Sequence, residues 1–590
     1  MKSFIQTVLA VIVGLFIAGL CCVLLTMCSM VAIIASSDSK TPTRANDVLV
    51  IYPQGTVEET EGGFNFSAVL QGGLPTNEAP SLRQIVQAID LAEKDDNVKG
   101  IYLCFDQMAA APATYQAICK RLESFKQNSG KWIIAYGDSY GPSQYYTASV
   151  ADSIFINPMG GFSWGGMGGA MIYYKGFFDK YNIDIDVFRV GKFKSAVEPY
   201  ITDQMSEANR LQTVTYMRDI WDEYAGVVAD KRKLPADSLE AWANRNLTFL
   251  RPNELPEGFF DGIRYRQDMY ALVKQMAGQK EDEEFHGISV KEIITNAEKD
   301  DKDDKVAVLY AVGEIVDQSA GSGSLQIVGE ELVSEIKGLA MDDNVKAVVL
   351  RINSPGGSAF ASEQMWYALQ QLKTKKPLVV SMGDYAASGG YYISTPGQYI
   401  FAEPNTITGS IGVFGVVPNV ERLANSFGLK VETVETHEHG AIQPPLKQLD
   451  LDEKAMIQHS VEDTYDTFLT RVSDGRGLSK DSVQEIAQGR VWTGKRALGI
   501  GLVDELGGLR EAVAKAAALA NLSEGSYAVQ NYPAEKDPFT SMLEDIKGGV
   551  KLKVSSFLFD RDGRIEQEID RLLNQNPIQA RMTEVPAPVK

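Results

Sequence analysis

The feature that most constrains this chain is an internal duplication that runs through most of its 590 residues. The run Asp95–Lys99 recurs as Asp342–Lys346, 247 residues later, and Tyr145-Tyr146 recurs as Tyr391-Tyr392 at nearly the same offset. Further pairs at that offset are Gly137 with Gly383 and Pro158 with Pro404. A near-constant spacing over such a length indicates two tandem copies of one structural unit.

Each copy has the pattern of strands that alternate with helices. In the first copy, Val48–Tyr52, Gly100–Phe105 and Trp132–Tyr136 are short apolar runs typical of buried strands. Ser81 to Gln84 resembles a helix-capping box and is followed by apolar residues at helical spacing. The second copy repeats this order from Val306 onward. The alternation predicts an α/β fold built on parallel sheets, with the first copy in residues 45–297 and the second in 298–532.

Residues 1–44 are predicted to anchor the chain in a membrane. No charged residue occurs from Phe4 to Ala35, and about 20 apolar residues suffice to span a bilayer. A cleaved signal peptide is the alternative, but its apolar core is usually only about 7–15 residues long. Few charges flank the run on either side, so charge alone does not decide its orientation.

Composition limits the classes of function that the chain can have. The net charge of -20 disfavours binding to the phosphate backbone of nucleic acids, so we expect no nucleic-acid partner. Three of the five cysteines lie in the apolar N-terminal run, which leaves too few for a disulfide framework or a cysteine-rich zinc site. Residues 533–590 form a charged C-terminal tail to which the sequence assigns no function.

Two glycine-rich strand ends in the second copy carry the candidate chemistry. The expected strand Leu378–Met382 runs into Gly383–Tyr391, where small residues flank Ser388. A serine at a strand-to-helix turn is exposed as a nucleophile beside backbone N–H groups. The segment Asn353–Ser358 ends another strand with paired glycines, which can offer donors to a developing oxyanion. The first copy has Pro142 in place of Ser388, so only the second copy retains the serine turn.

A nucleophilic serine needs a base, and the residues leave more than one candidate. His437 and His439 lie downstream in a charged stretch that is more typical of an exposed loop. A lysine can serve if burial keeps its amine neutral, and the first copy offers Lys192 and Lys194. By offset, Gly440 of the second copy replaces Lys194. A serine kept in one copy and a lysine kept in the other suggest one active site shared by both.

Four motifs together resemble the signal peptide peptidase A family in its long, tandem-repeat form, also called protease IV. They are Lys194–Pro199, Asn353–Ser358, Gly383–Tyr391 and Thr408–Gly412, in the order in which the family has them. The resemblance covers essentially the whole chain. It implies two Clp-protease/crotonase-like repeats in a bacterial serine protease held in the cytoplasmic membrane by one helix. It also implies that the protease degrades cleaved signal peptides, works outside the cytoplasm and assembles as a homotetramer.

The resemblance also assigns roles to individual residues. Ser388 would be the nucleophile, Lys194 the general base, and Ser410 the residue that orients the lysine amine. Backbone N–H groups of Gly356 or Gly357 and of Gly389 would form the oxyanion hole, with no metal and no cofactor. The fold alone would also suit acyl-CoA chemistry or a membrane-tethered scaffold. The split serine and lysine argue against a scaffold, and the anchor argues against a CoA enzyme.

Overall fold

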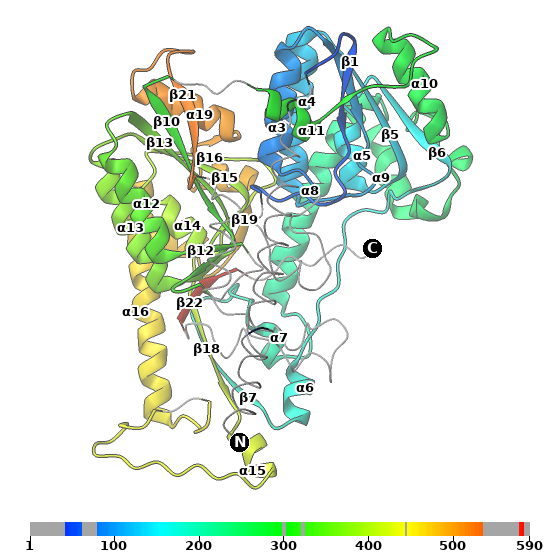
Figure 1. Cartoon of the computed structure of the whole chain (residues 1–590). Coiled ribbons are helices and arrows are strands. Elements are labelled where there is room, and N and C mark those ends of the chain that lie inside the picture. Colours follow the sequence, from blue (N-terminus) through cyan, green and yellow to red (C-terminus); the bar gives the residue numbers. More distant parts are fainter. Residues whose placement is uncertain are drawn as a thin grey trace, which may run out of the picture.

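The first copy folds around a sheet of six parallel strands. Their order across the sheet is β8-β6-β5-β3-β1-β9. The strands are β1 (Asp47–Ile51), β3 (Val98–Leu103), β5 (Trp132–Tyr140), β6 (Ser153–Phe162), β8 (Gly262–Ile263) and β9 (Ile288–Ser289). The main helices around it are α3 (Leu82–Lys94), α4 (Pro112–Ser129), α5 (Pro142–Ala148), α8 (Glu207–Arg232), α9 (Ala236–Arg245), α10 (Arg266–Ala277) and α11 (Val290–Asn296). This sheet lies at the upper right of Figure 1.

The computed structural model describes residues 42–61, 79–297, 302–319, 325–442, 445–534 and 578–582, together with Gly14 and Lys40. Within these residues, no helix has both the length and the apolar character that crossing a membrane requires. The predicted anchor, residues 1–44, lies outside the described residues apart from Gly14, Lys40 and residues 42–44. Of the predicted C-terminal tail, only residues 533–534 and 578–582 are described.

The second copy repeats the sheet of the first. Its strands follow the order β19-β17-β15-β13-β10-β21, with β16 and β20 joined at the side of β15. They are β10 (Lys305–Val312), β13 (Val345–Ser354), β15 (Leu378–Ala387), β16 (Tyr399–Ala402), β17 (Ile407–Gly409), β19 (Val491–Thr493), β20 (Glu505–Leu506) and β21 (Ala528–Tyr532). Its main helices are α12 (Gly329–Met341), α13 (Ala359–Lys373), α14 (Gly389–Ser394), α16 (Leu451–Arg476) and α19 (Leu509–Leu519).

The strand pairing confirms the duplication at the level of register. In the first copy Val48 of β1 pairs with Gly100 of β3, and in the second Val306 of β10 pairs with Ala347 of β13. Both pairs follow a register shift at the first residue of the strand, and both are parallel. Two tandem α/β copies are therefore present, as the sequence predicts.

A third sheet joins the two copies. Its order is β12-β11-β14-β22-β18-β7. These strands are β7 (Asp184–Arg189) of the first copy, β11 (Glu314–Val316), β12 (Gln326–Val328), β14 (Gly356–Ser358) and β18 (Phe414–Asn419) of the second, and β22 (Ile578–Arg581) of the tail. It runs down the centre of Figure 1, where β22, β18 and β7 follow one another. The antiparallel pairing of β7 with β18 brings the chain that follows β7 to the second copy.

Buried polar contacts also connect the copies. The Arg351 guanidinium of β13 donates two hydrogen bonds to the Glu59 carboxylate, at 2.8 and 3.0 Å, and both side chains are under 5% exposed. The Asp384 carboxylate of β15 accepts from the backbone N–H and the hydroxyl of Thr114, each at 2.7 Å. A charged group that is buried without a partner destabilises the folded protein. Each copy therefore depends on the other for the partners of its buried charged groups.

Candidate functional site

Ser388 lies at a strained turn between β15 and α14. Its φ of 54° and ψ of -113° belong to a region that residues other than glycine rarely adopt. The turn is held because the Ser388 N–H donates to the Gly409 carbonyl at 2.8 Å, and the side chain is fully buried. At the equivalent place in the first copy, Gly141 and Pro142 begin α5. Strain of this kind is common at functional sites. The turn places the Ser388 hydroxyl at the start of α14.

Lys194 reaches Ser388 from the first copy. It lies in the loop between β7 and α7 (Glu198–Ile201), and its Nζ is 2.7 Å from Ser388 Oγ. The same Nζ is 3.2 Å from Ser410 Oγ and 3.1 Å from the Ser410 carbonyl oxygen. The structure thus brings together the three predicted side chains within a single chain.

Burial determines the charge of Lys194. The side chain is 1% exposed, and burial lowers its pKa well below the usual value for lysine. Its aliphatic part packs closely against two glycines: a Cβ at Gly489 would lie 2.6 Å from Lys194 Cβ, and one at Gly412 would lie 3.2 Å from Lys194 Cδ. A neutral amine beside a serine hydroxyl can accept the hydroxyl proton.

The three glycines that the resemblance assigns to the oxyanion hole pack closely beside Ser388. A Cβ at Gly357 would lie 2.0 Å from the Ile315 carbonyl oxygen, and one at Gly356 would lie 2.8 Å from the Gly389 nitrogen. Gly356 and Gly357 also have φ values of 100° and 154°, which favour glycine. Their backbone atoms therefore approach the Ser388 turn in a way that a side chain would prevent. The Gly356 N–H already donates to Ser354 Oγ at 3.2 Å.

The alternative bases lie elsewhere. Lys192 is exposed, with its Nζ over the Phe193 ring at 5.2 Å from the centroid. His437 is also exposed, and its Nδ1 is 3.0 Å from the Thr436 hydroxyl. Since Ser388 is fully buried against Lys194, neither residue competes with that contact.

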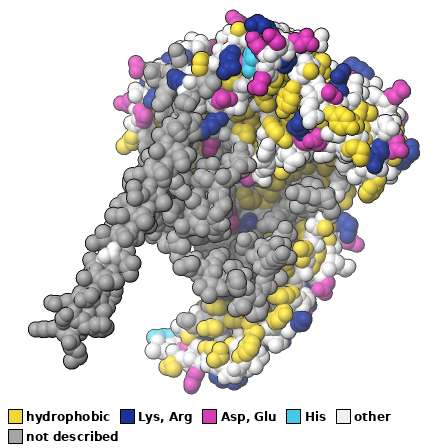
Figure 2. Space-filling model, turned by 45° about the vertical axis from the view of Figure 1, so that its right-hand side comes forward, with side chains coloured by type: hydrophobic (Ala, Val, Ile, Leu, Met, Phe, Trp, Pro, Cys, Tyr) yellow, Lys and Arg dark blue, Asp and Glu magenta, His cyan; other side chains and the backbone are white. Residues whose placement is uncertain are grey.

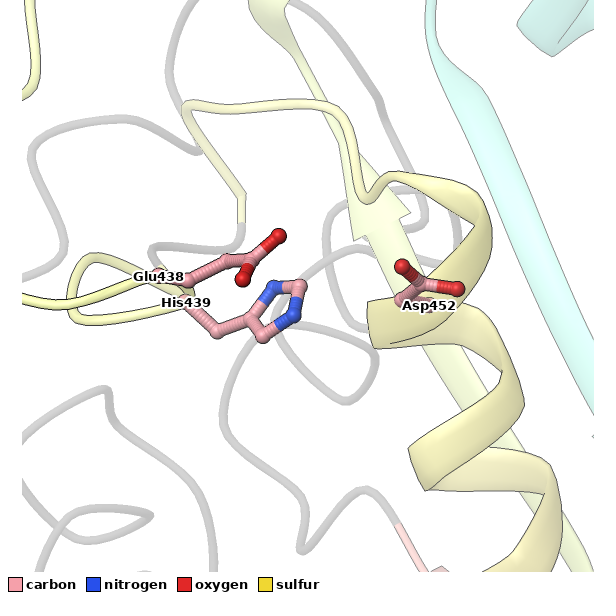
Figure 3. A group of neighbouring side chains, drawn as sticks. All are labelled: Glu438, His439 and Asp452. Atoms are coloured by element: carbon pink, nitrogen blue, oxygen red, sulfur yellow. The ribbon is translucent and has the colours of Figure 1, made fainter.

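His439 belongs to a group of carboxylates at the start of α16. Figure 3 shows Glu438, His439 and Asp452 facing one another, with their nearest oxygen and nitrogen atoms within 4.8 Å. A second group combines His439 with Asp450 and Glu453. These last two acids have structural roles: Asp450 caps α16, and Glu453 accepts a hydrogen bond from Lys447 at 3.3 Å. Helix capping and ion pairing therefore account for the two acids of the second group.

Sequence reasoning missed a buried amide that holds the loop carrying Lys194. Gln212 of α8 donates from Nε2 to the Phe193 carbonyl at 3.1 Å and to Ser195 Oγ at 2.9 Å. Its Oε1 accepts from the Val491 N–H of β19 at 3.3 Å. The residues on either side of Lys194 are thereby tied to the second copy. A lone glutamine within a polar helix has no sequence signature, and only the structure assigns it this place.

The site holds a buried lysine amine in contact with a serine hydroxyl, beside glycine backbone groups at a strained turn. In such an arrangement a lysine can act as the base for a serine nucleophile. The profile of "Peptidase family S49" matches the chain twice, over residues 125–280 and 370–523. These two matches cover more than half of the chain, one in each copy.

Similar proteins agree with this assignment. The chain is 37% identical over 481 residues to "Protease 4" of Salmonella typhi, which covers 80% of this chain and 77% of that protein. It is 29% identical over 522 residues to "Serine protease SPPA, chloroplastic" of Arabidopsis thaliana, covering 86% of this chain and 74% of the relative. The chain therefore belongs to peptidase family S49 and is a serine protease. The resemblance inferred from the four motifs is confirmed.

Among solved structures, a ClpP1 variant from Listeria monocytogenes matches with a TM-score of 0.24 and 14% identity. The match covers 35% of this chain and 94% of that one. A likeness at this level carries no argument about the fold. The two α/β copies rest instead on the sheets described above and on the two profile matches.

Proposed function

We propose that this protein is a membrane-anchored serine endopeptidase in which Ser388 is the nucleophile and Lys194 the general base. The observation that carries the proposal is the 2.7 Å contact between Lys194 Nζ and Ser388 Oγ, two buried groups supplied by different copies. Burying an amine in this way costs stability, and proteins retain such a cost mainly where the group has a function. Taking a proton from a serine hydroxyl is such a function.

The reaction is an acyl transfer in two stages. The neutral Lys194 amine takes the Ser388 proton as Oγ attacks the peptide carbonyl, and it then protonates the leaving amine. Water hydrolyses the resulting ester with Lys194 again acting as the base. Ser410 orients the amine, because its hydroxyl and carbonyl oxygens both lie within 3.2 Å of Nζ.

Backbone groups stabilise the negative charge that develops on the carbonyl oxygen. We assign this role to the N–H groups of Gly357 and Gly389, with Gly356 shaping the turn, because the Gly356 N–H already donates to Ser354. Fixed donors aimed at a developing oxyanion are among the largest contributions to catalysis, at about 3–4 kcal/mol each.

The proposed substrates are cleaved signal peptides and other apolar peptides, and the proposed place of action is the outer side of a bacterial cytoplasmic membrane. The uncharged run Phe4–Ala35 supports the anchor. Exposed hydrophobic side chains support assembly with further copies, the proposed homotetramer. They gather at the lower end of the molecule (Figure 2), where Figure 1 places α15 (Glu421–Ser426), and include Phe427, Leu429 and Val434, which are 77%, 64% and 92% exposed. Light scattering on the full chain in detergent measures the assembly directly.

The test of the function is cleavage of a synthetic signal peptide by the full-length protein in detergent. We expect Ser388→Ala and Lys194→Ala each to lower kcat by at least about a thousandfold while the fold is kept. Lys192→Ala is the matched control, because it removes an exposed lysine two residues away, and it should retain activity. Activity that survives Lys194→Ala would contradict the assignment of the base.

A further inference from the structure

Arg490 is a cation of the second copy that lies beside the proposed active site. It directly precedes β19, and its carbonyl oxygen accepts a hydrogen bond from the Ser410 N–H at 2.7 Å. Its guanidinium carbon lies 4.2 Å from the centroid of the Trp492 ring and 5.0 Å from that of Phe193, the residue before Lys194. Aromatic rings attract a cation, but they offer no oxygen to the five N–H donors of a guanidinium. The side chain is therefore held against the loop that carries Lys194 with its donors unpaired by these rings.

The lack of an acidic partner distinguishes Arg490 from comparable arginines. Among the residues that the structure describes, every other arginine that is at least partly buried forms an ion pair with a carboxylate. Arg121 pairs with Asp90 at 2.6 Å, for example, and Arg471 pairs with Glu363 at 2.5 Å. Arg490 is also partly buried, but it forms no ion pair with a described residue. A cation that is partly removed from water without a partner is costly, so a carboxylate bound there would be favoured.

The surroundings of Arg490 add positive charge. The Lys192 amine lies over the same Phe193 ring, 5.2 Å from its centroid. Partial burial and then the nearby charge of Arg496 lower the pKa of Arg490. The Asp219 carboxylate is committed to Arg496, from which it accepts hydrogen bonds at 2.5 and 2.7 Å. In a chain whose net charge is -20, this local excess of cations beside the proposed active site favours an anionic group of a ligand.

The register of the strands gives the distance from Arg490 to the proposed nucleophile. Ala387 precedes Ser388 and pairs with Gly409 of β17. Gly409 in turn pairs with Val491 of β19, which follows Arg490. Neighbouring strands lie about 4.8 Å apart, so two strand spacings place the backbone at Arg490 about 10 Å from the Ser388 turn. An extended peptide advances about 3.3 Å per residue, and about three of its residues therefore span this distance.

We propose that Arg490 binds a carboxylate of the peptide substrate, about three residues from the bond that is cleaved. This inference rests on the proposed function of Ser388 and Lys194. Two sources can supply the carboxylate: the free carboxyl end of a peptide that has already been cut from a longer chain, and the side chain of an Asp or Glu. The planar guanidinium can donate two parallel hydrogen bonds to either one. A terminal carboxylate would place the cut about three residues from the end of the substrate, whereas an acidic side chain would place it within the peptide.

The experiment measures KM for the full-length protein in detergent with matched synthetic peptides. One apolar peptide is made with a free carboxyl end and with a terminal amide, and an amidated set carries a single Glu at successive positions. We expect KM to be at least about tenfold lower for a peptide that bears the preferred carboxylate, as for one charge-assisted hydrogen bond. In Arg490→Gln this preference should vanish, while KM for the uncharged amide stays as in the wild type. Arg490→Lys should keep part of the preference, and Lys495→Gln, at an exposed lysine in the same segment, is the control that should keep all of it.

The peptides also identify the source of the carboxylate. A preference for the free carboxyl end, with products cut about three residues from it, would assign the terminal carboxylate. A preference for amidated peptides with Glu at one position would assign an acidic side chain. Mass spectrometry of the products locates the cut in both cases, and either result supports the inference.

Three outcomes would overturn the inference. They are a wild type that does not distinguish the peptides, a preference that survives Arg490→Gln, and an equal loss of activity on charged and uncharged peptides in Arg490→Gln. The last result would make Arg490 a structural residue.

Binding without catalysis separates this inference from the proposed function. In the Ser388→Ala background, fluorescence anisotropy should show tighter binding of the peptide with the preferred carboxylate, and adding Arg490→Gln should remove the difference. That result in a protein that hydrolyses none of the peptides would contradict the proposed catalysis and not the carboxylate site. Hydrolysis without any preference would contradict the carboxylate site and not the catalysis.

Discussion

Two lysines that are two residues apart show how burial decides chemistry in this protein. Lys192 is exposed, and its amine lies over the Phe193 ring. Lys194 is 1% exposed, and its amine contacts oxygen atoms of Ser388 and Ser410. Water stabilises a charged amine far better than these neutral oxygens do, so burial favours the uncharged form. The surroundings of Lys194 therefore favour the neutral amine that the proposed reaction needs as its base.

The pH dependence of activity should report the lowered pKa of Lys194. Burial lowers the pKa of Lys194, and the proposed reaction needs the neutral amine. We expect log(kcat/KM) to rise by about one unit per pH unit and to level off at a pH below the usual lysine pKa of about 10.4. Steady-state kinetics from pH 5 to 10 measure this. A profile that is flat over that range, or one that falls as pH rises, would contradict the role of Lys194.

Removing the buried amine should stabilise the protein. The unfolded chain holds a proton on Lys194 up to about pH 10.4, whereas burial lowers the pKa in the folded state, so the stability of the wild type rises with pH between those two values. Lys194→Met fills the same space without an amine, and we expect a free energy of unfolding about 1–2 kcal/mol higher at pH 7. The advantage should shrink toward pH 10. Denaturant unfolding at both pH values measures it, and a less stable Met variant would contradict this reasoning.

At the scale of elements, the lysine loop is positioned by α8. Gln212 bonds to the residues before and after Lys194 and accepts from Val491 of β19. Next to it, Glu198 accepts from the Asn209 amide at 3.0 Å and from the Ser206 hydroxyl at 2.5 Å. These hydrogen bonds hold the loop in one arrangement, and that of Gln212 with Val491 connects it to the copy that carries Ser388.

Gln212→Leu should lower activity without removing any reacting group. The Ser195 hydroxyl and the Phe193 carbonyl would lose a buried partner, and the lysine amine would be held less accurately. We expect kcat to fall about ten- to a hundredfold, with KM changed less. Val214→Ala, at a side chain 58% exposed on the same helix, serves as the control. Equal kcat values for Gln212→Leu and the wild type would show that the loop does not depend on α8.

The sequence predicted those elements whose patterns are local. The capping box at Ser81 and Gln84 is present at the start of α3, and the serine turn follows β15 as expected. Complementary losses in the two copies suggest one site shared by both, and the choice of Lys194 over Lys192 rests on the family resemblance. The sequence does not predict the pairing of β7 with β18 or that of β22, because strand pairing between distant segments leaves no periodic signal in a single sequence. Residues 533–590 are charged and weakly periodic, so the sequence assigns them no function.

At the scale of the whole molecule, the proposed active site forms where the two copies meet. Each copy folds on its own sheet, but the Lys194 amine and the Ser388 hydroxyl come from different copies. The buried pair of Arg351 and Glu59 belongs to the same contact between copies. The duplication thus brings the proposed base and nucleophile together within one chain.

Breaking that pair should weaken the contact between the copies. Arg351→Met leaves the Glu59 carboxylate buried without its partner, and such a change typically costs about 3–5 kcal/mol. We expect a lower Tm and a loss of activity, because Ser388 and Lys194 would no longer be held together. The double variant Arg351→Met with Glu59→Met removes both charges and should recover part of the stability. A double variant less stable than the single one would contradict this explanation.

The most direct test of the central claim is covalent labelling of Ser388. The full-length protein would be treated with a biotinylated fluorophosphonate, which reacts with activated serines, and the labelled peptide identified by mass spectrometry. We predict one labelled site, Ser388, with labelling that increases with pH in the wild type and is lost in Lys194→Ala but not in Lys192→Ala. Labelling at another serine, or equal labelling of Ser388 in the absence of Lys194, would contradict the claim that a buried lysine from one copy activates a serine in the other.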